Sequence, residues 1–487
     1  MTQPLPRAWE ADARSVIDPD GRGPLRLLGG PGTGKSQLLV DAAAARIAAG
    51  ADPESVLLMC VSARTAARAR AALTAAWSRS GGRAAIREPL VRSVHSYAFA
   101  VLRLAARRTG DPPPRLVAGT EQEGIISELL AGDLEDGPCA AVAWPESLRP
   151  ALTTAGFATR LRDLLARCAE RGVDPLHLQR IGRAAGRPEW VAAGQFAQQY
   201  EQVMLLRAAA GMAAPQATVP ALGAAELVGA ALEAFAADPG LLAAERRRVR
   251  VLLVDDAQNL DPPAARLVRA LAAGAARTVI AGDPNQAVFG FRGADPALLG
   301  ADAPAVTLTR SYRCAPAVVR AVNGVAARLP GNPAYRGFAS IAALPGSVSL
   351  RLAASVHAEA ALIADALRRA HLIDGVPWSQ MAVIVRSLPR AGTVLPRALV
   401  AAGVPVVVPP PAMPPAEVPA VRALLLVLAH LRGPRRRSGT GATDRTDRAR
   451  RPGVAAPIAS HVEPPRCRPT GPRLSTAAAR CAGRRRR

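Results

Sequence analysis

The sequence is poor in lysine, in aromatic side chains and in long apolar runs. Lysine occurs once among 487 residues, at Lys35, although lysine and arginine together number 62. Aromatic residues make up 3% of the chain, so an aromatic side chain beside a motif is more informative than usual. The longest apolar stretch near the C-terminal end is residues 423–429, which is too short to span a bilayer. We therefore expect no membrane partner.

Cysteine is also scarce, and its spacing is uninformative for metals. The six cysteines show no C-x-x-C or comparable metal-ligand spacing, which favours reduced thiols over a disulfide framework or a zinc site. The first residues, MTQPLPRAWEADAR, contain no apolar segment of the kind that signal peptides have. Together these absences predict a cytoplasmic protein.

Positive charge is abundant but unevenly placed. The net charge is +24, and more than half of it lies in residues 432–487. The chain outside residues 432–487 is also basic, which is typical of proteins that bind a polyanion such as nucleic acid. The charge of the C-terminal segment is weaker evidence, because an arginine-rich disordered end binds any polyanion.

Strand and helix patterns divide the chain into several parts. Strands alternating with helices predict a parallel α/β domain formed by residues 1–110 and 246–310. Between them, residues 111–245 show a series of helical patterns with few strand signals, and predict a helical insertion.

A second α/β pattern follows, and then the periodicity stops. Residues 311–432 predict a partial α/β domain with strands at 348–352, 381–385 and 404–408. Residues 433–487 are rich in Arg, Pro, Gly, Thr and Ser without any period, and predict a disordered arginine-rich tail.

The single lysine lies in a phosphate-binding motif. Residues 29–36 read GGPGTGKS and match G-x-x-x-x-G-K-[ST], the nucleotide-binding P-loop. An apolar run precedes the motif and an Ala/Leu-rich helical pattern follows it, as the motif requires. Lysine is a slim point charge, whereas arginine is a broad planar fork that a cradle of backbone N–H groups does not accommodate. The alternative is a Gly/Pro loop that contains Lys-Ser by chance. The candidate nucleotide-binding residues of the loop are Gly29, Gly30, Pro31, Gly32, Thr33, Gly34, Lys35 and Ser36.

Two adjacent acids follow an apolar run. Asp255 and Asp256 come directly after residues 251–254, whose sequence is VLLV. An acid at the end of a strand beside a P-loop can hold Mg²⁺ together with the Ser36 hydroxyl. The second acid can orient or deprotonate an attacking water. The alternative is an ordinary strand-end turn or a helix N-cap.

Taken in order over roughly residues 9–430, these motifs resemble those of UvrD/Rep-type superfamily 1 DNA helicases, particularly actinobacterial members such as the motor subunits of mycobacterial helicase–nucleases. The resemblance implies a P-loop NTPase: a RecA-like parallel-sheet motor domain with a helical insertion and a partial second RecA-like domain. It further implies ATP and Mg²⁺ as cofactors, single-stranded and duplex DNA as partners, and 3′–5′ unwinding in DNA repair or recombination. A second helicase–nuclease subunit is a further partner that the resemblance raises.

The resemblance also implies roles in the nucleotide site. Lys35 would contact the β- and γ-phosphates, and Ser36 and Asp255 would hold Mg²⁺. Asp256 stands where the family usually has a catalytic glutamate, and Gln258 matches the glutamine of the same motif.

Further residues match later motifs. Gln286, in GDPNQ, would sense the γ-phosphate and relay its state to DNA. Phe291, in FGFRG, would stack on a base of single-stranded DNA. In Ser-Tyr-Arg, which resembles N-Y-R, Tyr312 would stack on adenine and Arg313 would reach the γ-phosphate.

Two segments resemble the DNA-backbone contacts of the family. Ser62 and Arg64 match part of a T-N-K segment, and Ser93 and His95 match part of T-F-H-S. Without the motif, His95 would more often be an ordinary core or surface histidine.

The chain departs from the family pattern in three ways. Asp12 replaces the glutamine that reads adenine, which puts adenine selectivity in doubt, and Asp256 is one methylene shorter than glutamate. After Arg432 neither the T-x-H-x-x-K-G-L coupling motif nor the late arginine motif is found. We therefore expect a C-terminally truncated helicase whose last residues resemble out-of-frame sequence, able to bind Mg-ATP but poor in unwinding. The alternatives are a non-motor, nucleotide-dependent DNA-binding subunit and an inactive gene remnant.

Overall fold

The computed structural model describes most of the chain up to residue 406. The predicted tail, 433–487, lies outside the described residues. The described ranges are 9–79, 90–117, 119–210, 221–223, 225–299, 303–330, 336–386 and 394–406.

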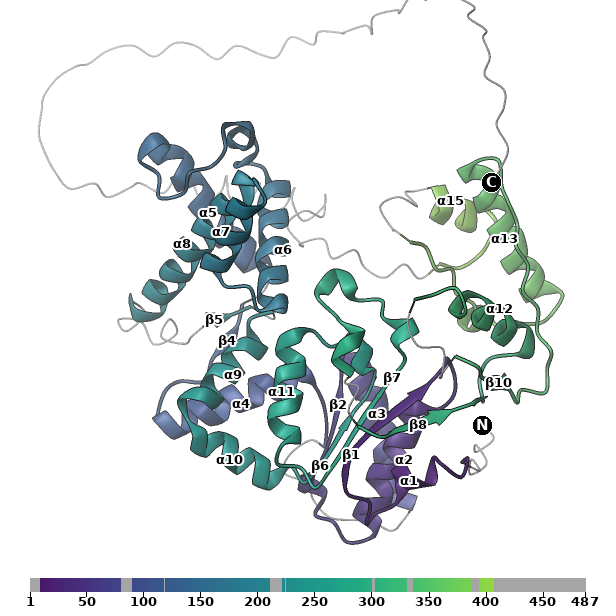
Figure 1. Ribbon diagram of the computed structural model, residues 1–487. Coiled ribbons are helices and arrows are strands. Elements are labelled where there is room, and N and C mark those ends of the chain that lie inside the picture. The colour runs from purple at the N-terminus through teal and green to yellow at the C-terminus, as the bar shows by residue number, and fades with distance from the viewer. Residues whose placement is uncertain are drawn as a thin grey trace, which may run out of the picture. The chain divides into compact units, whose positions relative to one another are not determined.

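A six-stranded parallel sheet forms the centre of the first domain (Figure 1), in the order β3-β2-β6-β7-β1-β8. Every neighbouring pair is parallel, which confirms the predicted α/β class. Because the strands run in the same direction, their carboxyl ends share one edge of the sheet. The strands are β1 (Gly23–Gly29), β2 (Val56–Cys60), β3 (Val91–Ser93), β6 (Val251–Val254), β7 (Arg277–Gly282) and β8 (Ala305–Leu308).

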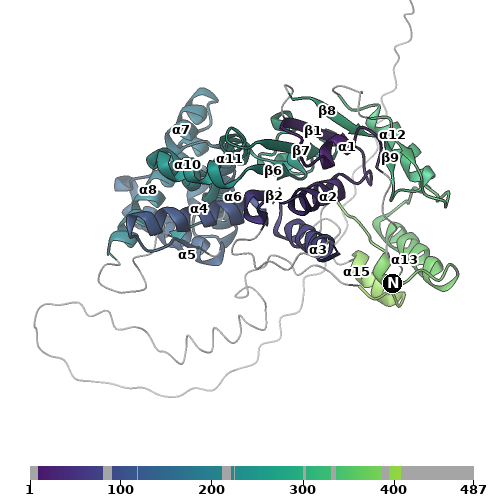
Figure 2. The ribbon, with the colours of Figure 1, turned by 90° about the horizontal axis from the view of Figure 1, so that it is seen from below.

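Helices cover both faces of this sheet (Figures 1 and 2). One apolar core lies between the sheet and α1 (Arg14–Ile17), α2 (Lys35–Ala48) and α3 (Ala63–Arg79). A second core lies on the other face, and its helices are α4 (Val94–Thr109), α9 (Leu227–Ala237), α10 (Pro239–Arg248) and α11 (Pro262–Ala272).

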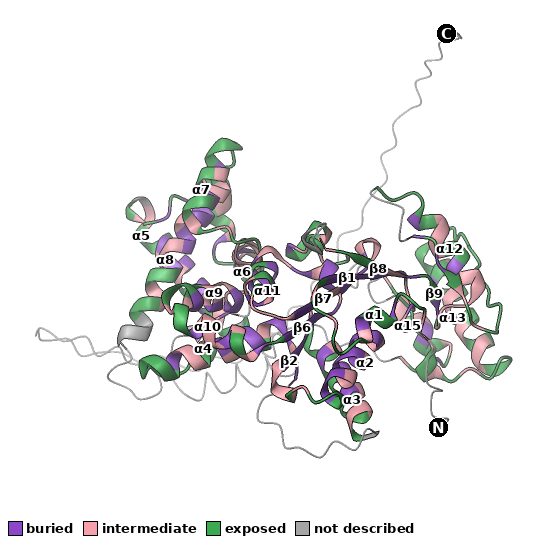
Figure 3. Cartoon of the chain, turned by 60° about the horizontal axis from the view of Figure 1, so that its bottom comes forward, coloured by how far each residue is buried: buried purple, intermediate pink, exposed green. Residues whose placement is uncertain are grey.

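The central strands are buried on both faces, as their composition predicts. All residues of β2 (VLLMC) and of β6 (VLLV) are buried, and the sheet is mostly buried in Figure 3. Strands covered by helices on both faces read as continuous apolar runs. This explains why the run before the two acids was recognisable in the sequence.

The part of the predicted insertion (111–245) up to residue 210 has an apolar core of its own. It contains α5 (Gly119–Asp136), α6 (Ala155–Arg171), α7 (Pro175–Ala184) and α8 (Pro188–Ala210). Phe196, Trp144 and neighbouring aliphatic residues fill its centre. Thr154 and Asp174 start α6 and α7 by accepting a hydrogen bond from the backbone N–H three residues later. A short parallel pair, β4 (Arg115–Leu116) with β5 (Ala221–Leu222), accompanies the insertion. Residues 227–245 of the predicted insertion lie in α9 and α10, which pack in the core of the first domain.

The described residues between 310 and 406 form less sheet than predicted. They contain α12 (Pro316–Ala326), α13 (Val356–Leu372) and α15 (Val394–Ala401), and one parallel pair, β9 (Arg310–Ser311) with β10 (Ala339–Ser340).

The prediction of strands at 348–352 and 381–385 was wrong. Neither segment belongs to a strand, and Leu350 and Ile384 are 91% and 94% exposed. Alternating apolar residues create one apolar face, but a strand also needs a neighbouring strand to pair with. Residues 404–406 are not in a strand either, and the rest of that predicted strand lies outside the described residues.

No single helix in the described ranges has the length and apolar character needed to cross a membrane. The helices α9 and α10 reach that threshold only when taken as a pair, and they are bent by 106° at the break between them.

Candidate nucleotide site and DNA-contact surface

The loop between β1 and α2 has the backbone of a phosphate cradle. Gly32 and Gly34 have φ angles of +73° and +93°, a region that residues with a Cβ rarely adopt. The Thr33 hydroxyl donates a hydrogen bond to the Gly30 carbonyl at 2.9 Å, which closes the turn. The loop leads directly into the N-terminus of α2 at Lys35, and a helix N-terminus with free N–H groups is a favourable place for an anion.

Lys35 is held inside this loop. Its ammonium group donates to the carbonyl oxygens of Gly29 at 2.7 Å and Gly30 at 3.2 Å. The residue is 8% exposed, and burial lowers the pKa of its side chain, although nearby carboxylates, Asp283 foremost, partly oppose this. The loop thus positions a partly desolvated positive charge where phosphate oxygens would bind.

The two acids stand at the end of β6 beside the loop. Asp255 is buried, and its backbone N–H continues the ladder by donating to the Met59 carbonyl at 2.8 Å. Asp256 turns the chain with a φ angle of +52°, the only positive φ of a non-glycine residue in the described part of the chain. Its backbone N–H donates to Oδ1 of Asp255 at 3.0 Å. The strand end therefore presents two carboxylates together.

The buried carboxylate of Asp255 is electrostatically costly. Burial, followed by repulsion from Asp256, raises the pKa of Asp255 from 3.8 to about 6. A hydrogen bond from the Ser36 side chain and the charge of Lys35 work in the opposite direction. A divalent cation at this position would offset the repulsion between the two acids.

These oxygens fit Mg²⁺ together with a nucleotide. The Ser36 hydroxyl and the Asp255 carboxylate are hydrogen-bonded next to the loop, and both are hard oxygen ligands. Within the described ranges, no three His, Cys, Asp or Glu side chains gather to hold a metal by themselves. Mg²⁺ commonly uses one or two carboxylates together with substrate phosphates and waters, so the donor set is sufficient.

A chain of hydrogen bonds runs from Asp256 to Gln286. The amide group of Gln258 donates to Oδ1 of Asp256 at 3.2 Å, and its oxygen accepts from the backbone N–H of Asp283 at 3.1 Å. Asp283 in turn accepts from the Gln286 amide at 2.7 Å. The chain connects the end of β6 with the short helix η6 (Pro284–Gln286) after β7.

The segment around β9 packs directly on the loop. The Ser311 hydroxyl donates to the Pro31 carbonyl, and the Tyr312 N–H donates to the Gly32 carbonyl, both at 2.9 Å. A Cβ on Gly32 would lie 2.9 Å from Cβ of Arg313. Tyr312 and Arg313, 280 residues away in sequence, are thereby brought to the candidate nucleotide site.

Two aromatic residues at this site were missed in the sequence. The Trp9 ring lies edge-on to Tyr312 with centroids 5.8 Å apart, and its indole N–H donates to Asp41 at 3.0 Å. Phe338 covers Gly30 so closely that a Cβ there would lie 2.3 Å from the ring. The scarcity of aromatic residues was the available signal, but neither residue belongs to a recognised motif.

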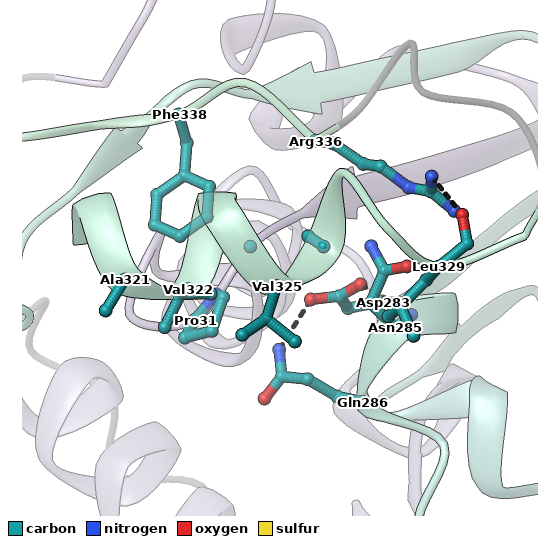
Figure 4. A pocket seen from close by; sticks show the side chains of 12 residues that line it. Pro31, Asp283, Asn285, Gln286, Ala321, Val322, Val325, Leu329, Arg336 and Phe338 are labelled. Carbon is teal, nitrogen blue, oxygen red and sulfur yellow. Dashed lines mark hydrogen bonds between the residues drawn. The ribbon is translucent and has the colours of Figure 1, made fainter. Parts of the chain in front are cut away.

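A cavity of 290 Å³ lies beside the loop (Figure 4). The Gln286 and Asp283 side chains line one side, and apolar residues of α12, such as Val325, line the other. The hydrogen-bond chain thus ends at a boundary between the first domain and the residues that follow it.

The candidate DNA-contact residues lie at the same edge of the sheet. Ser62 and Arg64 follow β2, Ser93 ends β3 and His95 follows it, and Phe291 follows β7 in the short helix η7 (Gly290–Arg292). Phe291 is 61% exposed. The Ser62 and Ser93 side chains also have local structural roles, because each accepts a hydrogen bond from the backbone N–H three residues later.

Comparison with known proteins relates the chain to helicases of the UvrD/REP family. The family model of the UvrD/REP helicase N-terminal domain matches residues 9–305. The chain is 33% identical over 147 residues to the ATP-dependent DNA helicase UvrD2 of Mycobacterium tuberculosis H37Rv, which covers 28% of the chain and 21% of that protein. It is 26% identical over 147 residues to the ATP-dependent DNA helicase Rep of Escherichia coli K12, covering 29% and 22% respectively. The match spans about a fifth of the length of these curated relatives.

Proposed function

The chain belongs to the UvrD/REP helicase family, and we propose that it is an ATP-dependent DNA motor that acts on single-stranded DNA and separates duplexes in the 3′–5′ direction. The observation that carries this proposal is the hydrogen-bond chain from Asp256 through Gln258 and Asp283 to Gln286. It connects a candidate hydrolytic carboxylate with the loop that leads to the exposed Phe291. Such a connection is what coupling between hydrolysis and DNA requires.

In the proposed reaction the loop binds the ATP phosphates. The amides of residues 29–36 would surround the phosphates, and the Lys35 ammonium would contact the β- and γ-phosphates. Ser36 and Asp255 would hold Mg²⁺, which supplies charge neutralisation on the phosphate oxygens.

Asp256 is the proposed orienting group for the attacking water. Its carboxylate lies at the strand end beside the loop, and Gln258 holds one of its oxygens at 3.2 Å. Because the backbone of Asp256 has a positive φ, the direction of this side chain is set by the turn rather than by β6 itself.

The proposed contacts of Tyr312 and Arg313 are with adenine and the γ-phosphate. Both follow β9, and the Ser311 hydroxyl at the end of β9 and the Tyr312 N–H each donate to a carbonyl of the loop. Arginine beside a transferring phosphoryl group stabilises charge in the transition state, and such a residue can contribute several orders of magnitude in rate. Ser62, Arg64, Ser93 and His95 are proposed to contact the DNA backbone.

Steady-state ATP hydrolysis with and without single-stranded DNA tests the proposal. We expect turnover that DNA stimulates and that Lys35→Ala abolishes. Turnover that is independent of Lys35, or no binding of either ATP or DNA, would contradict it.

A second candidate is nucleotide-dependent DNA binding without strand separation. It is favoured by the region 310–406, whose described residues contribute only the short pair β9 and β10 instead of a second full sheet. An unwinding assay separates the two, because a complete motor displaces a labelled strand in an ATP-dependent way and a binding subunit does not.

A further inference from the structure

Two aromatic residues after β7, the half-buried Phe289 and the exposed Phe291, form a small platform with an arginine. The rings of Phe289 and Phe291 have centroids 6.1 Å apart. The Arg292 guanidinium carbon lies 5.7 Å from the first ring centroid and 5.6 Å from the second. Aromatic faces beside guanidinium groups suit unpaired bases, which stack on the rings while the phosphates pair with the charges.

The helical insertion reaches this platform through α6. The Arg167 guanidinium carbon lies 5.5 Å from the Phe291 centroid. Arg171 donates to the Gly290 carbonyl at 3.4 Å. Gly293 is buried, with a φ angle of +83°, and a Cβ there would lie 3.2 Å from Cγ of Arg171. The α6 helix also contacts α11 of the first domain (Figure 1). Its C-terminal end is therefore closely packed on the platform.

Arginines continue from the platform along one face of α6. Arg160, Arg167 and Arg171 are separated by seven and four residues, which places them in one stripe about 16 Å long. Two acids border this stripe: Glu170 pairs with Arg167 at 2.8 Å, and Asp163, three residues from Arg160, pairs with Arg162. Three arginines against two acids leave the stripe a net positive charge. Arg162 itself lies on the opposite face of the helix and also pairs with Glu123.

We propose that this α6 stripe is the phosphate-binding wall of a single-stranded DNA site whose base-stacking floor is Phe289 and Phe291. The inference rests on the proposed function and adds the helical insertion to the DNA site. The guanidinium fork matches phosphate oxygens, and the exposed ring of Phe291 requires a base that is not paired. The strand leaves the platform along α6 in the direction of Arg160.

The test is fluorescence anisotropy of the full chain with labelled oligo(dT), at several salt concentrations between about 50 and 200 mM. Each phosphate contact on a single strand contributes about 0.7 to the slope of log affinity against log salt. The triple variant Arg160→Gln, Arg167→Gln, Arg171→Gln is expected to bind at least about tenfold more weakly, with a slope reduced by up to about two. Phe291→Ala is expected to weaken binding without changing the slope.

Controls separate this inference from the proposed function. Arg369→Gln removes an exposed arginine on α13 and is expected to bind as the wild type does. Binding of a fluorescent ATP analogue checks the fold of each variant. If the triple variant loses that binding, the single variant Arg160→Gln decides, because Arg160 is exposed and lies at the end of the stripe far from the platform. Its slope should fall by about 0.7.

The inference is overturned if the arginine variants keep the wild-type affinity and slope while Phe291→Ala weakens binding; the proposed function then stands. If the wild type itself does not bind oligo(dT), both fail.

Discussion

The Asp283 backbone N–H donates to the Gln258 side-chain oxygen across 3.1 Å, so one amide joins the polypeptide after β6 to the polypeptide after β7. The same side chain donates to Asp256, and it is almost completely buried. A buried amide with both ends bonded has little freedom to move alone. These hydrogen bonds form a contiguous route by which a displacement at Asp256 would reach Asp283 and Gln286.

Gln258→Leu should interrupt this connection. The change leaves the Asp283 N–H without its acceptor, which costs about 1–3 kcal/mol of stability. We expect ATP binding to change little and DNA-stimulated turnover to fall by up to about a hundredfold, because Asp256 loses its support. Comparison of nucleotide affinity with kcat measures this. Gln195→Leu removes a similar acceptor, for the Ala143 N–H in the insertion, and should leave turnover unchanged.

Gly30→Ala should strain the contact between the loop and Phe338. The added methyl would lie 2.3 Å from the ring, and overpacking of this kind costs about 1–3 kcal/mol. Chemical denaturation measures the loss. In a Phe338→Ala background the same change should cost less, because the space is vacated. Gly290→Ala, with nothing within 4 Å of the new methyl, is the matched control. An equal cost in both backgrounds would exclude the contact as the cause.

Asp255→Asn should stabilise the nucleotide-free protein while removing its activity. The substitution removes a buried charge next to Asp256 and keeps the acceptor for the Asp256 N–H. We expect a gain on the order of 1 kcal/mol in thermal unfolding without Mg²⁺ and a loss of at least about a hundredfold in turnover. Asp174→Asn, at an exposed helix cap where both residues are favourable, should change neither. A lower melting temperature for Asp255→Asn would contradict the expected charge repulsion.

Glu245 should make stability depend on pH in the acidic range. Its burial favours a higher pKa, but hydrogen bonds from Arg248 and Tyr97 outweigh burial and hold the pKa of Glu245 below its ordinary 4.5. A depressed pKa stabilises the folded state above the unfolded value, and this stability is lost as pH falls. At neutral pH the free energy of unfolding of the wild type should exceed that of Glu245→Gln by about 1–3 kcal/mol. The difference should shrink below about pH 4.5. Glu146→Gln, at an exposed position, should show no such pH dependence.

The first domain was largely predictable because its signals are local. The loop at 29–36 has a fixed spacing, and Asp255 follows a strand that is buried on both faces and hence uniformly apolar. These two signals place a glycine-rich turn and a carboxylate at the same edge of a parallel sheet. Family resemblance then suggested Tyr312 and Arg313, which the structure brings to the loop.

What could not be predicted depends on contacts between distant parts of the chain. Trp9 and Phe338 adjoin the nucleotide site only because the folded chain returns there, and nothing in their local sequence indicates it. Alternation at Val348, Leu350 and Leu352 predicted a strand, but alternation does not provide a pairing partner. The packing of α6 on Gly293 is of the same long-range kind.

That Lys35 is the single lysine of the sequence has a practical consequence for chemical labelling. An amine-directed reagent has one side-chain target in all 487 residues, and that target lies within the phosphate loop. Since burial lowers the pKa of Lys35, more of its amine is uncharged, and hence nucleophilic, than at an ordinary lysine. The extent of labelling at Lys35, read by peptide mass mapping so that the N-terminal amine is counted separately, thus becomes a chemical footprint of loop occupancy that needs no engineered tag.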